Sequence, residues 1–210
     1  METMFGLSKK ELTSLRRLSS PQKIQDYLES LPFNFEKSGE TLMSPRRVLK
    51  EKRAHCLEGA LLAAAALWLQ GEKPLLLDLK THKKDQEHVV ALFRSNGYWG
   101  AISKTNHAVL RYRDPIYESV RELALSYFHE YFLNSNGQKT LESYSTPFDL
   151  STLGDAWVTD EEDLWHISQR LDRVRHFPVV PKKNQRQIRK ATKVEREAGA
   201  ITEWKNMKRT

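Results

Sequence analysis

The stretch KRAHCLEGALLAAAALWLQG, residues 52–71, contains the single cysteine of this 210-residue chain. From Leu57 to Leu69 nearly every residue is apolar, and a helix that is apolar all round is a buried helix. Gly71 suits the position just past the end of such a helix, and Pro74 follows where a helix cannot continue. We therefore predict a buried helix that carries Cys56 in its first turn.

The spacing of the apolar residues changes after this helix. Leu75–Leu79 and His88–Phe93 are typical of strands, and Tyr98–Ser103 follows the hairpin-type turn Ser95-Asn96-Gly97. The buried helix needs an apolar partner, and these strands are the nearest one along the chain. A run of helices followed by hairpin-linked strands indicates an α+β fold. We expect the buried helix to pack on a small antiparallel sheet, with flanking helices.

Helix start signals recur on both sides of this core. Serine or threonine three residues before glutamate, or directly before proline, marks the first turn of a helix. On this basis, together with apolar spacing, helices are expected at 8–18, 20–31, 44–51, 114–132 and 159–171, with 138–158 mostly loop and 177–183 a linker. The helix at 114–132 rests on the start signal Asp114-Pro115 and on apolar positions from Ile116 to Phe132 at helical spacing.

Positive charge is concentrated at the C-terminal end of the chain. Residues 181–210 hold ten Lys or Arg against three Glu, whereas residues 1–180 hold 24 of each sign. We expect one globular domain over 1–180 and a basic tail over 181–210, either helical or disordered. Such a tail could bind an acidic partner or nucleic acid through Lys182, Lys183, Arg186, Arg189, Lys190 and Lys193.

Several classes of protein find no support in the sequence. One cysteine cannot form an intrachain disulfide, and no apolar run reaches the length of a membrane span, which favours a cytoplasmic protein with no membrane contact. Zinc-type ligands occur at His55, Cys56, His82 and His88, but adjacent residues rarely face one ion, and no CxxC or HExxH motif is present. No metal or cofactor is expected.

The position of Cys56 has a chemical meaning if the thiol is more than a packing group. A lone buried cysteine usually only fills space. At the first turn of a helix, however, free amides and the helix dipole favour the thiolate. A nucleophilic cysteine needs a histidine and a group that orients it. His88 begins the second strand, and Trp99 and Ser103 lie on the third.

These ordered segments resemble the transglutaminase-like superfamily, within the papain-like cysteine fold, and most closely a bacterial branch of it. The likeness rests on SPRRVLKEKRAHC before the helix, EHVVALF on the second strand and YWGAIS on the third, and covers roughly residues 20–133. It implies an acyl-transfer enzyme of the peptidase, amidase or transglutaminase kind, acting on a peptide or a small amide or ester. Cys56 would be the nucleophile and His88 the base.

The chain departs from the family pattern at the third catalytic position. The resemblance implies an aspartate four residues after Trp99, where this sequence has Ser103. Asn106 is an alternative orienting group for His88, and Asp78 a more distant one. Glu58 and Trp99 are expected at the substrate cleft. The missing aspartate leaves a second hypothesis open: a non-catalytic interaction domain on the same fold, with the basic tail binding an acidic partner.

Overall fold

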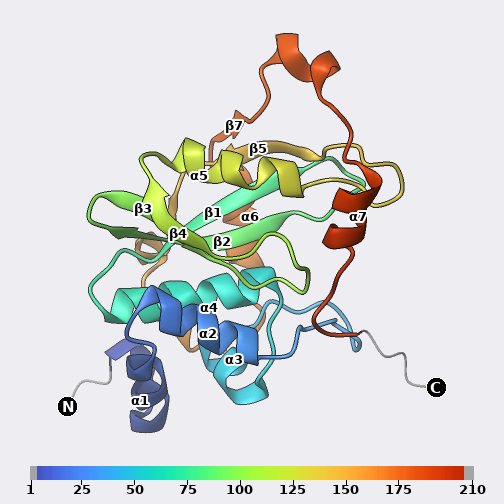
Figure 1. The fold of residues 1–210 in the computed structure, drawn as a ribbon. Helices are drawn as coiled ribbons and strands as arrows, with labels where there is room; N and C mark the ends of the chain where they lie inside the picture. The colour runs from blue at the N-terminus through green and yellow to red at the C-terminus, as the bar shows by residue number, and fades with distance from the viewer. Residues whose placement is uncertain (1–3, 206–210) are drawn as a thin grey trace.

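A computed structural model describes residues 4–205 as a seven-stranded antiparallel sheet with helices on both faces (Figure 1). The strand order is β4-β3-β2-β1-β5-β7, and β6 pairs with the free part of β1. The strands are β1 (Leu75–Thr81), β2 (His88–Ser95), β3 (Tyr98–Ile102), β4 (Arg113–Tyr117), β5 (Leu141–Ser145), β6 (Phe148–Asp149) and β7 (His176–Pro178). The predicted α+β class is confirmed.

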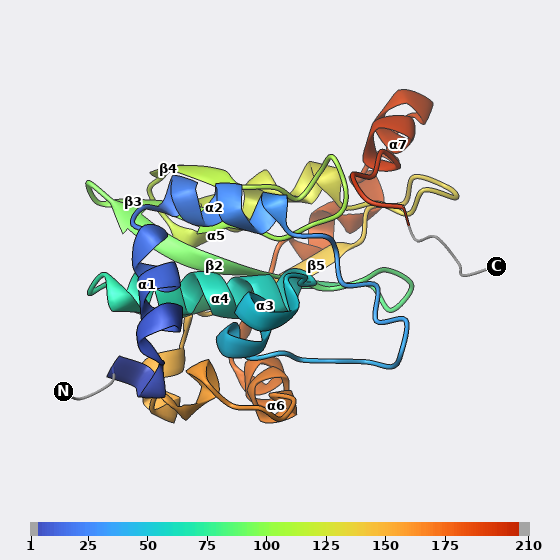
Figure 2. The ribbon, with the colours of Figure 1, turned by 90° about the horizontal axis from the view of Figure 1, so that it is seen from below.

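The predicted buried helix is confirmed as α4 (Cys56–Leu69), whose side chains from Leu57 to Leu67 are all buried. It lies against β1 and β2 on one face of the sheet, and the three preceding helices pack around it (Figures 1 and 2). Those helices are α1 (Lys9–Arg17), α2 (Pro21–Ser30) and α3 (Pro45–Glu51). The sheet and the surrounding helices thus leave no solvent-facing side to α4, which explains its wholly apolar sequence.

The helix starts predicted from serine are also confirmed. Ser8, Ser20 and Ser44 each accept a hydrogen bond from the backbone amide three residues further on, as N-cap side chains do. Past the end of α4, Gly71 has a φ of 90°, a left-handed conformation that glycine adopts without steric cost.

The opposite face of the sheet is covered by α5 (Val120–Ser126), which packs on β3 and β4 and contributes to a second apolar cluster (Figure 1). The remaining helices are α6 (Trp165–Arg173) and α7 (Lys193–Gly199), with 3₁₀ turns η1 (Met4–Gly6), η2 (Phe128–Glu130), η3 (Leu150–Leu153), η4 (Ala156–Val158) and η5 (Lys182–Gln187). Among the described residues, no helix is long and apolar enough to cross a membrane.

The predicted long helix at 114–132 is wrong. Residues 113–117 instead form β4 at the edge of the sheet, where proline is tolerated because one side of the strand makes no ladder hydrogen bonds. Helix α5 starts only after Ser119, whose side chain accepts a hydrogen bond from the Glu122 amide. The helical spacing from Val120 onward therefore corresponds to a real but shorter helix, whereas Pro115 lies in a strand.

Three other expectations in the C-terminal half also fail. Residues 138–158 contain β5 and β6, the helix expected from Thr159 begins at Trp165, and the expected linker at 177–183 contributes to β7. Each of β5, β6 and β7 has at most five residues. Such short segments carry too few alternating positions for a period of two to stand out, so their pairing partners decide their structure.

Gly59 is required where α4 meets the end of β3. A Cβ atom added at this position would lie 2.5 Å from the Cβ of Lys104 and 3.1 Å from its Cγ. Alanine in place of a mid-helix glycine usually stabilises a helix by about 1 kcal/mol. Here we expect Gly59→Ala to lower the free energy of unfolding, by about 2 kcal/mol, in urea titrations. A variant as stable as the parent would contradict this packing.

Candidate active site

Cys56 lies where two cavities meet at the N-terminal end of α4. The larger cavity has a volume of about 520 Å³ and is also lined by His88 and by residues 104–107. The smaller one, of about 280 Å³, extends toward α6. The thiol is partly buried, and the residues His55 and Cys56 line both cavities. The single cysteine is therefore reachable from a concave surface.

His88 and Ser103, predicted at neighbouring strands, do come together. The His88 Nε2 atom lies 2.7 Å from the Ser103 hydroxyl oxygen, and both side chains are buried. The hydroxyl donates its only proton to the backbone carbonyl of Leu110 at 2.5 Å, so it accepts from His88. The Nε2 atom of His88 therefore carries a proton, and Nδ1 is the ring nitrogen that remains for the sulfur of Cys56.

A second imidazole, that of His55, also faces the thiol. Its Nε2 lies 3.0 Å from the Thr41 carbonyl oxygen, which can only accept, so this nitrogen carries a proton. The same atom lies 3.4 Å from a carboxylate oxygen of Glu58. The other ring nitrogen is then the one available to Cys56. The rings of both His55 and His88 act on the thiol and lower its pKa.

The ionisation of the Cys56 thiol depends on both rings, and that of His55 depends on the thiol. Burial would raise the pKa of the Cys56 thiol, but the hydrogen bonds and charges of His55 and His88 hold it well below its usual value. Burial likewise disfavours the charged form of His55, yet Cys56, Glu58 and the Thr41 carbonyl raise the pKa of its ring to about 9. The arrangement favours a thiolate beside an imidazolium at neutral pH.

Glu58, expected at the cleft, lies inside the protein instead. Its side chain is 0% exposed and lines neither cavity. Its two oxygens accept hydrogen bonds from the Asn34 amide, the Thr41 hydroxyl and the backbone amides of Met43 and His55. A fully bonded buried carboxylate of this kind fixes the loop before α4 and the ring of His55 rather than meeting a substrate.

The other expected site residues have partners other than His88. The Asn106 amide side chain donates to the backbone carbonyl of Trp204 and accepts from its amide, at 3.0 and 2.8 Å. It lines the larger cavity but holds the C-terminal segment, not His88. Trp99 packs with the second apolar cluster, under Arg94, and lines neither cavity. Asp78 is bonded to His176 at 3.0 Å.

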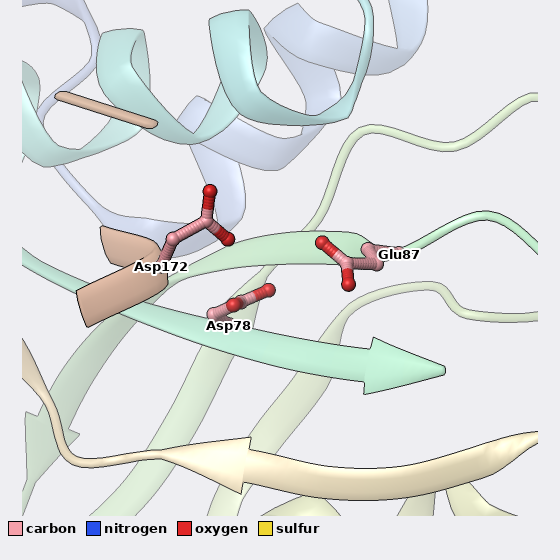
Figure 3. Close-up of side chains that lie close together, drawn as sticks. All are labelled: Asp78, Glu87 and Asp172. Atoms are coloured by element: carbon pink, nitrogen blue, oxygen red, sulfur yellow. The ribbon is translucent and has the colours of Figure 1, made fainter. Parts of the chain in front are cut away.

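Three carboxylates gather in the smaller cavity, as Figure 3 shows: Asp78 from β1, Glu87 just before β2 and Asp172 from α6. Oxygen atoms of the three lie within 4.8 Å of one another. Lys80 is already paired with Asp172 at 2.6 Å and lies 3.9 Å from Glu87. Burial and the nearby Glu87 raise the pKa of Asp78 to about 6, although its hydrogen bond with His176 opposes this.

The C-terminal segment is partly built into the fold. α7 is anchored by the Arg196 guanidinium on backbone carbonyls of 134 and 135, and His107 bonds to the Gly199 carbonyl at 3.0 Å. The basic side chains predicted to bind an acidic partner are all exposed: Lys182, Lys183, Arg186, Arg189, Lys190 and Lys193. Their binding role stays a prediction.

The place of His55 beside the thiol is the feature of the site that the sequence did not predict. Its one candidate role there was that of a zinc ligand, which is disfavoured because two adjacent side chains rarely face one ion. A useful signal was present in Glu58, three residues on, since an acid at that helix position often bonds back to the residue that starts the helix. The sequence matches no family model, and no curated protein is significantly similar to it.

Proposed function

We propose that this protein is a cysteine-dependent acyl-transfer enzyme with Cys56 as the nucleophile, on a transglutaminase-like core. The observation that carries the proposal is a thiol at the start of a buried helix, in the wall of a cavity that His55 and His88 also line, with both rings lowering its pKa. Thiolates with depressed pKa values at such positions are the reactive form of catalytic cysteines. The substrate class is a peptide, or a small amide or ester.

The two histidines would have different tasks. His55 lies against the buried carboxylate of Glu58, so its positive charge is well suited to stabilise the thiolate. His88 bonds to the neutral Ser103 hydroxyl, which orients the ring without holding it charged. A ring of that kind can take up and release a proton during a reaction cycle. The carboxylate that is missing at position 103 thus has a counterpart behind the other histidine.

The reaction we propose proceeds through a thioester. The Cys56 thiolate, whose proton His88 has taken, adds to the substrate carbonyl while the π electron pair moves onto oxygen. The carbonyl then re-forms, and the bond to the leaving group breaks as His88 returns the proton to it. Water or an amine next gives a proton to His88, adds to the thioester, and releases the acyl product and the thiol.

The test uses p-nitrophenyl acetate as an activated ester. We expect one acetyl group per chain on Cys56, seen by mass spectrometry and as a burst of nitrophenolate, and none with Cys56→Ala. His88→Asn should slow acylation about 100-fold or more. The control His107→Asn lies in the same cavity without touching the thiol and should react normally. Folded wild-type protein that reacts no faster than urea-unfolded protein would refute the proposal.

A further inference from the structure

Tyr131, which lines the larger cavity, has a buried hydroxyl group without a hydrogen-bond partner. Tyr131 is 2% exposed and lines this cavity together with Cys56 and His88. Among the described residues, four buried side-chain polar atoms lack a hydrogen bond, on Tyr112, Tyr131, Arg196 and Trp204. Tyr131 alone of these four lines the cavity that holds the thiol. The unpaired hydroxyl therefore belongs to a residue that lines the candidate active site.

A buried hydroxyl without a partner is unfavourable, by about 1–3 kcal/mol. The same segment shows the ordinary solution, since the hydroxyl of Tyr127 donates to the Arg111 carbonyl at 3.1 Å. Unpaired buried donors that persist in a cavity wall are suited to bind a group that arrives with the ligand. In an acyl-transfer site, the group that arrives in need of a donor is the carbonyl oxygen of the substrate.

The electrostatic surroundings keep this hydroxyl protonated. Burial raises the pKa of Tyr131 well above its usual value, and the negative charge of Cys56 raises it further, followed by that of Asp85. Because the charge of Cys56 acts on the pKa of Tyr131, the phenol belongs to the same electrostatic surroundings as the thiolate. A phenol that stays neutral across the physiological range can donate a proton to a hydrogen bond without losing it.

We propose that Tyr131 is an oxyanion-stabilising residue of this site. As the sulfur of Cys56 adds to the carbonyl carbon, the π pair moves to oxygen, and the Tyr131 O–H donates a hydrogen bond to that oxygen. When the carbonyl re-forms, the pair returns, the leaving group departs, and the phenol keeps its proton throughout. The inference rests on the proposed function and adds to it a donor that contributes only when a carbonyl is attacked.

The experiment compares two reactions of the same thiol in Tyr131→Phe. Acylation by p-nitrophenyl acetate builds negative charge on a carbonyl oxygen, whereas alkylation by iodoacetamide displaces iodide from an sp³ carbon and builds none there. We expect acylation to slow about 100-fold and alkylation to stay within about twofold, because a donor that is merely structural would affect both. Stability should be unchanged or slightly higher, since the change removes an unpaired buried hydroxyl.

Tyr112→Phe is the matched control. The hydroxyl of Tyr112 is also buried without a partner, but its ring stacks on Phe93 in the apolar cluster around α4. Tyr112 does not line the cavity. It should leave both rates unchanged. Acylation of Tyr131→Phe within threefold of wild type would overturn the role of Tyr131 alone. A wild-type protein that is not acylated at all would instead overturn the proposed function, and this inference with it.

Discussion

Glu58→Gln should lower the free energy of unfolding by at least about 3 kcal/mol, although it only replaces one carboxylate oxygen by an NH₂ group of nearly equal size. The carboxylate is 0% exposed, and each of its oxygens accepts hydrogen bonds from protein donors. Glutamine offers one oxygen and one NH₂ group. Whichever way it turns, two hydrogen-bond donors then face each other inside the protein, and neither can reach water.

Urea titration followed by tryptophan fluorescence measures this loss. Glu122→Gln is the matched control, because Glu122 also lies in the first turn of a helix and accepts a backbone hydrogen bond, from the Glu118 amide at 2.8 Å, but is exposed. The control should change stability by no more than about 0.5 kcal/mol. Equal effects of the two substitutions would mean that the buried network around Glu58 does not stabilise the fold.

The second large effect is expected in the pH dependence of Cys56 alkylation. An ordinary thiol with a pKa of about 8.5 becomes about 50-fold more reactive between about pH 6.5 and 8.5 as thiolate forms. Cys56 should change by less than about threefold, because its depressed pKa means that thiolate is already present. The supporting cation on His55, whose pKa is raised to about 9, is present below that pH and is lost as pH rises through it.

His55→Asn should restore the steep profile. Removing this imidazolium raises the pKa of the thiol, so we expect the alkylation rate at about pH 6.5 to fall more than 10-fold while the rate above pH 9 changes little. His166→Asn, on the exposed face of α6, serves as the control. Since Cys56 is the only cysteine, iodoacetamide incorporation reports on it alone. A flat profile in His55→Asn would show that His55 does not hold the thiolate.

The failures of sequence reasoning have a common origin. The helical spacing that starts at Asp114-Pro115 includes three positions that do belong to a helix, Val120, Leu123 and Ala124. What moved residues 113–117 into the sheet was the open edge of β3, a partner that no local pattern reveals. The prediction that Glu58 lines the cleft failed similarly, because its partners Asn34, Thr41 and Met43 come from a loop without regular periodicity.

The sequence by itself determined the parts of this protein that depend on neighbours in the chain. The serine caps, the wholly apolar α4, the hairpin at 95–97 and the position of Cys56 in a first turn all follow from spacing over a few residues. These features are local, so the physical preferences that produce them act within one element.

The tertiary structure alone decided which groups surround the thiol. It brought His88 against Ser103, turned the Ser103 proton toward Leu110, and placed the unpaired hydroxyl of Tyr131 in the same cavity. It also buried the carboxylate of Glu58, which is only three residues from His55 in the chain, against donors from Asn34, Thr41 and Met43. Hydrogen bonds between side chains distant in sequence depend on how whole elements pack, and a single sequence carries no pattern that records them.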